Sequence, residues 1–116
     1  MANTFKTVTF AAEPASAGTP YVMYTVAGST TTVVLGLILA NVHTASVTAS
    51  VKLISNTSDT ETNENTLLVK DVAIPVGSSL EVLSGSKVVL QTTDVLKIDC
   101  SVSAKIDASL SIMEIT

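Results

Sequence analysis

The residue types that most often carry chemistry are scarce in this sequence. One cysteine, Cys100, and one histidine, His43, occur in 116 residues. A cysteine nucleophile needs a base, an orienting group and an oxyanion hole, and no motif marks the last two. One cysteine and one histidine also cannot complete a closed zinc site within a chain, although a site shared around a symmetry axis stays open. We therefore expect Cys100 to be a buried core thiol and His43 a surface turn residue.

The acidic residues are the next candidates for chemistry. Asp94, Asp99, Asp107 and Glu114 occur towards the C-terminus, but Asp99 falls on the polar face of a predicted strand, and Asp94 and Asp107 fall in predicted turns. General acid/base catalysis needs carboxyl groups that converge in a pocket, and the spacing gives no sign of convergence. We predict no catalytic residue, and an enzymatic role is left open only for a pocket formed between subunits.

A polar stretch lies in the middle of the chain. Residues 55–65 read SNTSDTETNEN and contain no apolar side chain. Carboxylate and amide oxygens are calcium ligands, yet the spacing matches no EF-hand loop. We predict a solvated loop with no metal and no cofactor, which could also be a contact surface for a partner. Its acidic and amide candidates are Asp59, Glu61, Asn63, Glu64 and Asn65.

The overall composition excludes several functions. Six lysines and no arginine stand against ten acidic residues, for a net charge of −4. Because nucleic-acid binding needs a cationic surface for phosphate contacts, we expect no nucleic-acid partner. The longest apolar stretch, residues 33–40, is well short of the roughly 20 residues of a membrane span, so we expect no membrane partner. The first residues do not resemble a secretory signal, and we expect the chain to be made in a cytoplasm.

The order of apolar and polar residues predicts an all-β chain. Serine and threonine account for 31 residues, and valine, leucine and isoleucine for 34. Glycine, proline, asparagine and aspartate punctuate the chain at close intervals, as in all-β domains. We predict about eight or nine strands in an antiparallel β-sandwich of jelly-roll-like topology, as one domain over residues 1–116. Alternation is clear over 45–54 and 94–106, and a β pattern resumes over 66–74. A turn near 103–107 should divide the segment 94–106.

One predicted strand, residues 32–42, is apolar on both faces. Strict alternation puts Val33, Leu35, Leu37 and Leu39 on one face and leaves the other face to a second apolar set. A strand that is apolar on both faces is covered on both, and one cover here would be a neighbouring subunit or the N-terminal arm. We therefore predict a homo-oligomer, with a trimer as one arrangement, and we expect residues 1–18 to form an arm that reaches into a neighbour. The predicted interface residues are Val34, Ile38, Ala40 and Val42.

Two further local features are predicted near the C-terminus. Ser84-Gly85-Ser86 lies between two β-like segments and reads as a three-residue hairpin loop. Ala108, Leu110 and Ile112 should continue an inward face, but Met113 interrupts the alternation. We therefore expect a bulge or a sheet edge near Ile112.

From Lys70 onwards, turn and strand motifs follow one another in a set order. The order is an I-P-x-G-x-S-L turn, a glycine hairpin, K-x-V-L, a G-D-x-[IL]-x-V turn and strand, and a closing S-x-[LM]-E-I. The matching residues are Ile74, Pro75, Gly77, Ser79, Leu80, Lys87, Leu90, Asp94 and Met113 to Ile115. With these residues the segment resembles a module found in small virion structural proteins of tailed bacteriophages. It departs from that pattern at Thr93, where a glycine usually precedes the aspartate.

The resemblance implies a multi-copy virion subunit made in the host cytoplasm. Capsid decoration and attachment at the neck, tail or fibre are the stations it suggests, with other virion proteins as partners. The alternative is a host-surface module that binds a carbohydrate or receptor, with the loop 55–65 as its recognition element. Such modules stack sugars on exposed aromatic rings, and the four aromatic residues, Phe5, Phe10, Tyr21 and Tyr24, all lie in apolar, strand-like contexts.

Overall fold

The computed structural model describes residues 2–55, 64–83 and 87–116. These residues form nine strands and no helix, which confirms the predicted all-β class. Most of the loop 55–65 and all of Ser84-Gly85-Ser86 lie outside the described residues. The strands are β1 (Asn3–Glu13), β2 (Tyr21–Thr25), β3 (Thr31–Asn41), β4 (Val47–Ile54), β5 (Thr66–Ile74), β6 (Ser79–Glu81), β7 (Val88–Leu90), β8 (Val95–Cys100) and β9 (Ile106–Ile115).

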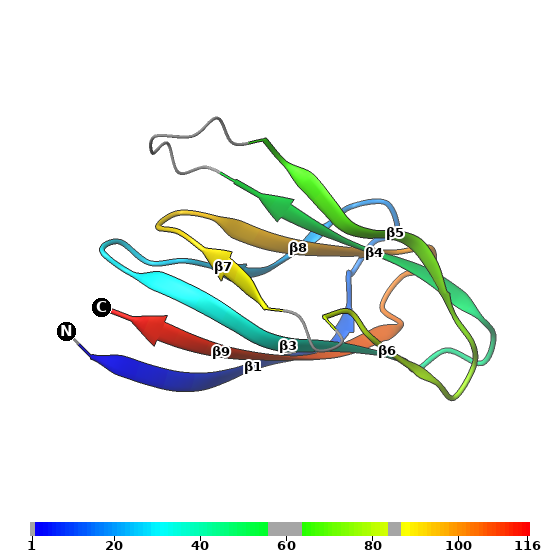
Figure 1. The fold of residues 1–116 in the computed structure, drawn as a ribbon. Helices are drawn as coiled ribbons and strands as arrows, with labels where there is room; N and C mark the ends of the chain where they lie inside the picture. The colour runs from blue at the N-terminus through cyan, green and yellow to red at the C-terminus, as the bar shows by residue number, and fades with distance from the viewer. Residues whose placement is uncertain (1, 56–63, 84–86) are drawn as a thin grey trace.

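The strands form two antiparallel sheets packed face to face (Figure 1). Sheet A has the order β1-β9-β3-β6, with β7 also paired to β3, and sheet B has the order β2-β8-β4-β5. The pairing is nested, because β1 pairs with β9, β2 with β8, β3 with β6 and β7, and β4 with β5. A long hairpin rolled into two sheets has this pairing, which is that of a jelly roll, as predicted.

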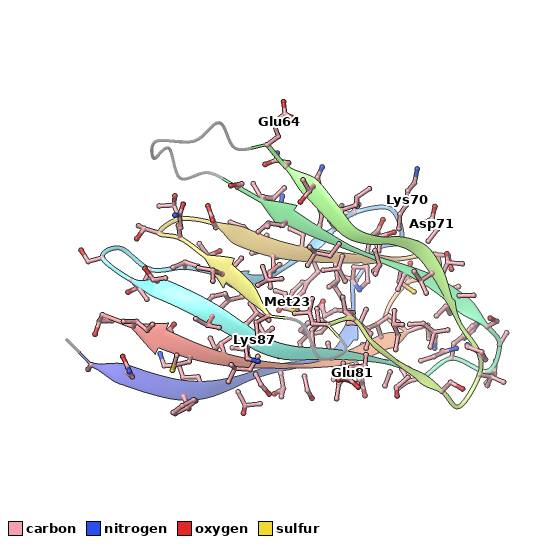
Figure 2. All side chains as sticks on the ribbon, in the orientation of Figure 1. Met23, Glu64, Lys70, Asp71, Glu81 and Lys87 are labelled. Atoms are coloured by element: carbon pink, nitrogen blue, oxygen red, sulfur yellow. The ribbon has the colours of Figure 1, made fainter. Side chains whose placement is uncertain are left out.

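The core lies between the sheets and consists of alternate residues of the inner strands. In β4 and β8 the buried residues follow the predicted alternation, since successive side chains of a strand point to opposite faces. Met23 of β2 also lies between the layers (Figure 2). The fully buried large side chains include Leu37, Leu39, Ile74, Leu90, Leu96, Ile98, Ile106, Leu110 and Ile112.

A bulge in β3 changes which of its residues face the core. The register with β9 shifts between Val34 and Gly36, so that Leu35 is the extra residue opposite Ser111 and Ile112. Val34 is 0 % exposed and lies in the core, and the prediction that it is a subunit-interface residue is wrong. The bulge inverts the alternation once, so Val33 and Leu35 lie outside although Leu37 and Leu39 lie inside. The irregularity expected near Ile112 is therefore present, with its extra residue on β3.

The segments before and after residues 84–86 do not form a hairpin with each other. β6 pairs with Ile38 to Ala40 of β3, and β7 pairs with Thr32 to Val34, both antiparallel to β3. Two strands antiparallel to the same neighbour run in the same direction, so the predicted hairpin is wrong. β6 and β7 are instead two short pieces of a single interrupted edge of sheet A.

The predicted turn between the last two strands is present but begins earlier. The turn covers residues 101–104 and includes Ala104 at a φ of 57°. At the other end of the chain, β1 extends to Glu13 and pairs with β9 of its own chain. The N-terminal segment is thus an edge strand of its own sheet, and its exchange between copies stays a prediction. Within residues 2–55, 64–83 and 87–116, no helix is long and apolar enough to cross a membrane.

Candidate subunit-contact surface

A row of apolar side chains crosses the outer face of sheet A. Phe5 of β1 is paired with Met113 of β9, Met113 with Val33 of β3, and Val33 with Val89 of β7. Directly paired residues place their side chains on the same face of a sheet, so these four residues form a continuous apolar ladder. Phe5 is 71 % exposed and Val89 is 58 % exposed. The two ends of the ladder are therefore its most accessible parts.

Hydroxyl side chains adjoin the apolar ladder. Thr7 pairs with Ser111, and Thr9 pairs with Ser109, in the rows that follow Phe5 and Met113. A shallow cavity of about 280 Å³ lies where the two zones meet, lined by Phe5, Thr7, Leu35 and Ser111 together with Lys6 and Ile112. Leu35 reaches this cavity because it is the bulged residue of β3. The face can therefore offer both apolar contact and hydroxyl hydrogen bonds.

Three of the four predicted interface residues lie on or beside this outer face. Ile38 is 46 % exposed and Val42 is 47 % exposed, while Ala40 is partly buried. They lie towards the other end of β3. Ile38 belongs to the row of Thr9 and Ser109, and the row of Thr7, Ser111 and Gly36 separates it from the apolar ladder. Val34 faces the core, as described above. Whether the remaining three contact another subunit stays a prediction.

A hydrogen-bonded network joins the two sheets at the end that carries the apolar ladder. The Tyr24 hydroxyl of β2 donates to Glu114 Oε2 at 2.5 Å, and it lies 2.8 Å from Thr32 Oγ1. Because a phenol has one hydrogen, the Thr32 hydroxyl is the donor in the second bond. Lys6 Nζ lies 2.7 Å from Glu114 Oε1. Tyr24, Thr32, Glu114 and Lys6 are called the Tyr24 network below.

The Tyr24 network changes the acidity of two of its members. Burial, followed by the hydrogen bond to Glu114, raises the pKa of Tyr24 to about 12. The hydrogen bond from Lys6, followed by that from Tyr24, holds the pKa of Glu114 below its usual value. Donors around a carboxylate favour its charged form, and a buried phenol disfavours ionisation. At neutral pH, Glu114 is therefore a fixed anion that holds both the Lys6 ammonium and the neutral Tyr24 hydroxyl.

Two adjoining cavities lie on the outer face of sheet B. Their volumes are about 310 Å³ and 250 Å³, and they share Ser50, Asp71 and Asp99. Asp99 Oδ1 accepts hydrogen bonds from the backbone N–H groups of Gly18, at 3.0 Å, and Cys100, at 2.9 Å. Asp99 therefore anchors the segment before β2 to β8. Of the four acidic residues considered from the sequence, Asp99 is the one that lines these cavities.

Asp71 marks a bulge in β5. Its φ of 48° is in the left-handed region, which aspartate tolerates better than most residues. The Asp71 N–H donates to Ser50 Oγ at 2.9 Å, so the Ser50 side chain replaces a backbone acceptor of the interrupted ladder. Figure 2 shows Lys70 and Asp71 projecting from β5 away from the sandwich. This strand edge is therefore both distorted and charged.

The other candidate residues from the sequence lie in the core, in turns or in a hydrogen bond to the backbone. Cys100 is buried, 3 % exposed, as predicted. His43 lies in a turn, as predicted, and is half-buried; its N–H donates to Asn41 Oδ1 at 2.7 Å. Asp94 is buried in a turn, and Asp107 Oδ1 accepts from the Ala12 N–H at 2.8 Å.

Sequence reasoning missed Asn41 and the Tyr24 network. The Asn41 amide donates to the carbonyl groups of Ala45 and Ile74, both at 2.9 Å, and so joins the ends of β3 and β5. An asparagine that directly follows an apolar strand was the available signal. No such signal exists for the Tyr24 network, because its members are distant in sequence.

Metal-ligating side chains do not gather in the part of the chain that the structure describes, where no group of three or more His, Cys, Asp or Glu residues could hold an ion. Comparison with protein-family models, with curated proteins and with solved structures found no match to this chain. The candidate functional surface is the outer face of sheet A, which carries the apolar ladder and the adjoining hydroxyl side chains.

Proposed function

We propose that the chain is a structural subunit of a tailed-bacteriophage particle. It would be present in several copies, as a capsid decoration protein or as an attachment subunit of the neck, tail or fibre. It would be made in the host cytoplasm, associate with itself and with other virion proteins, and contain no catalytic site.

The observation that carries this proposal is the apolar ladder on the outer face of sheet A. A contiguous exposed apolar patch on a folded protein marks a contact surface, and the ladder extends across four strand segments, from Phe5 to Val89. Its neighbours on this face are hydroxyl residues, Thr7 and Ser111 among them. Such a face is suited to packing against another protein.

Two further observations support a virion role. The segment from Lys70 to the C-terminus resembles small virion structural proteins of tailed phages, as described above. Double-sheet jelly rolls are used by viral capsid proteins, although lectins use them as well. Because a fold hosts many functions, the jelly roll adds weight only in combination with the resemblance.

The test is to locate the chain in phage particles. Particles purified from the source would be analysed by mass spectrometry for this chain, and its fold would be fitted into a cryo-EM map. Density repeated over the capsid lattice would identify a decoration protein, and density confined to the neck, tail or fibres would identify an attachment subunit. Absence of the chain from every particle would refute the proposal.

A carbohydrate-binding module is the second candidate, and one observation favours it. Phe5 is 71 % exposed beside the cavity that Thr7 and Ser111 line, so an aromatic ring and hydroxyl groups adjoin. Sugars stack on aromatic faces and hydrogen-bond to such groups. A glycan array with the intact chain, Phe5→Ala and the control Val89→Ala tests this. Hits lost only in Phe5→Ala would support the module, and an array without hits would contradict it.

A further inference from the structure

The four outer strand edges of the sandwich differ in how they are protected from pairing with another chain. Exposed edges are normally blunted by short strands, bulges or charged residues. The β5 edge has two register shifts, and Lys70 and Asp71 project from it. The β2 edge has five residues and one register shift, and the β6–β7 edge consists of two three-residue pieces. Three edges are therefore short, distorted or charged.

The β1 edge is long and free of bulges over most of its length, and the one charged residue of that stretch is Lys6. Asn3 to Phe10 pair with β9 in unbroken register, and the first shift comes between Phe10 and Glu13. No proline occurs within the strand. In Figure 1, β1 (blue) forms the lower boundary of the molecule, with no strand on its outer side.

The hydrogen-bond pattern shows which β1 groups are free for pairing. Ala2 and Thr116 exchange both backbone hydrogen bonds, at 3.1 and 2.9 Å. Antiparallel pairs alternate between hydrogen-bonded and non-hydrogen-bonded, so the even-numbered β1 residues bond to β9 and the odd-numbered residues direct N–H and C=O outward. The residues with outward-directed groups are Asn3, Phe5, Thr7 and Thr9.

The open edge is also electrically neutral. None of its four outward-bonding residues is charged, and their side chains belong to the face that carries the apolar ladder. The charged residue within the regular stretch, Lys6, is paired with Glu114 of the same chain. A neutral, self-complementary edge suits a second copy of the chain, whereas a strongly charged partner would find no opposite charge on it.

We propose that two copies of the chain pair through β1, antiparallel and about a two-fold axis at Thr7, so that sheet A continues across both molecules. In this register Phe5 lies opposite Thr9 of the second copy, and each such pair exchanges two N–H···O bonds. An axis at Lys6 would place two ammonium groups directly opposite each other, which is unfavourable; the axis at Thr7 places Lys6 opposite Val8. The inference gives a contact geometry to the multi-copy role proposed above, and in that respect rests on it.

The first experiment measures self-association of the full chain by analytical ultracentrifugation. We expect the unmodified protein to dimerise, and Thr7→Pro to weaken the dimer by about tenfold or more, because proline removes a bonding N–H at the axis. Ser109→Lys is the matched control, since Ser109 is on the same face one strand further in. An unmodified protein that stays monomeric, or a dimer that Ser109→Lys disrupts and Thr7→Pro does not, would overturn the proposal.

A second experiment tests the register and does not depend on proline. Hydrogen-bonded antiparallel pairs have Cα atoms about 5.5 Å apart, within disulfide range. Thr7→Cys should therefore form a covalent dimer under mild oxidation, and Thr9→Cys should not, because Thr9 faces Phe5 of the second copy. Cys100 is buried and does not compete. Failure of Thr7→Cys to cross-link while Thr9→Cys does so would overturn the proposed pairing.

The outcomes separate this inference from the virion proposal. A Thr7-dependent dimer of a chain that is absent from every particle would support the pairing and refute the virion role. A chain that is monomeric and present in particles would support the virion role and refute the pairing through β1. Circular dichroism of each variant checks that it folds, so that loss of the dimer can be assigned to the β1 edge and not to unfolding. If Thr7→Pro does not fold, Thr7→Lys replaces it.

Discussion

The edges formed by β1 and β5 show how one chain can leave one sheet boundary open and close another. β1 pairs with β9 over eight successive residues without a shift. β5 pairs with β4 through two shifts and carries a left-handed Asp71. Each strand contains one lysine and one acidic residue, so the number of charged residues does not distinguish them.

The difference lies in where charge and bulges occur. At β5, exposed Lys70 and Asp71 occupy the distorted segment, and a further strand would meet charges and misaligned bonding groups. At β1, the sole charged residue of the regular stretch is Lys6, which is tied to Glu114. Bulges and charges are how natural sheets avoid edge-to-edge pairing. On β1 the stretch from Asn3 to Phe10 has no bulge and its one charge is paired within the chain, and these two features are the basis of the proposed pairing.

The largest expected effect comes from removing the core beneath β1. Leu110 is 0 % exposed and lies opposite Val8 on β9. Leu110→Ala should lower the free energy of unfolding by about 2–5 kcal/mol, from lost burial and the cavity left behind. Urea denaturation measures the loss. A cost below that of the edge variant Thr7→Pro would contradict the assignment of β9 as the central support of sheet A.

A smaller effect tests which β1 amides are free. The Val8 N–H bonds to Leu110 of β9, whereas the Thr7 N–H is directed outward. Val8→Pro should therefore lower the free energy of unfolding by about 1–3 kcal/mol more than Thr7→Pro, because it leaves a ladder carbonyl without its donor. Thermal and urea unfolding of the two variants at low concentration give the difference. Equal costs would show that the alternation along β1 is assigned wrongly.

The Tyr24 network predicts a loss of stability in acid. The pKa of Glu114 is lower in the folded than in the unfolded chain. The stability that Glu114 contributes is therefore fully present above its unfolded-state pKa, and it is lost as the pH falls through its folded-state pKa. Glu114→Gln should cost about 1–2 kcal/mol at pH 7 and much less at low pH. Melting temperatures across the acid range measure this, with Glu81→Gln on the exposed β6 as the control. A constant difference between Glu114→Gln and the unmodified protein would contradict the prediction.

Tyr24 predicts a loss of stability in alkali. Its pKa is raised from 10.0 to about 12 in the folded chain. The stability that Tyr24 contributes is therefore fully present below pH 10 and is lost as the pH rises towards the folded-state pKa. Tyr24→Phe should remove this loss and leave Lys6 paired with Glu114. If Tyr24→Phe keeps the alkaline loss of the unmodified protein, the loss arises elsewhere.

The smallest expected effect concerns the protected edge. Ser50→Ala removes the acceptor of the Asp71 N–H and should cost about 0.5–1.5 kcal/mol. Thr48→Ala, on the same strand and face, is the control. Ser50→Ala should leave self-association unchanged, because β5 is not the pairing edge. An increase in association would show that the bulge is what keeps this edge closed.

The regular part of the fold follows from local patterns. The bounds of β5, Thr66 to Ile74, coincide with the predicted segment, and Val47, Ala49 and Val51 face the core as their alternation indicated. In β4 alternation is sufficient, because a strand with one buried face must repeat every two residues. The all-β class and the lone buried Cys100 were also predictable, since both depend on composition and on the parity of single strands.

The arrangement of side chains on sheet A and in the Tyr24 network depends on strand register, which no local sequence pattern contains. Val34 lies inside because a bulge at Leu35 changes the parity of β3, and only the register with β9 reveals it. The Tyr24 network joins residues 24, 32, 114 and 6, which chain folding brings together from three strands of sheet A and one of sheet B.

Patterning of apolar residues determined that this chain forms a β-sandwich, because burial of one strand face is a local requirement. The tertiary structure decided which strand is left at an open edge, since an edge is defined by the neighbour that a strand lacks. It also decided that Phe5, Met113, Val33 and Val89 share one row, because strand register, and not sequence distance, determines which side chains meet.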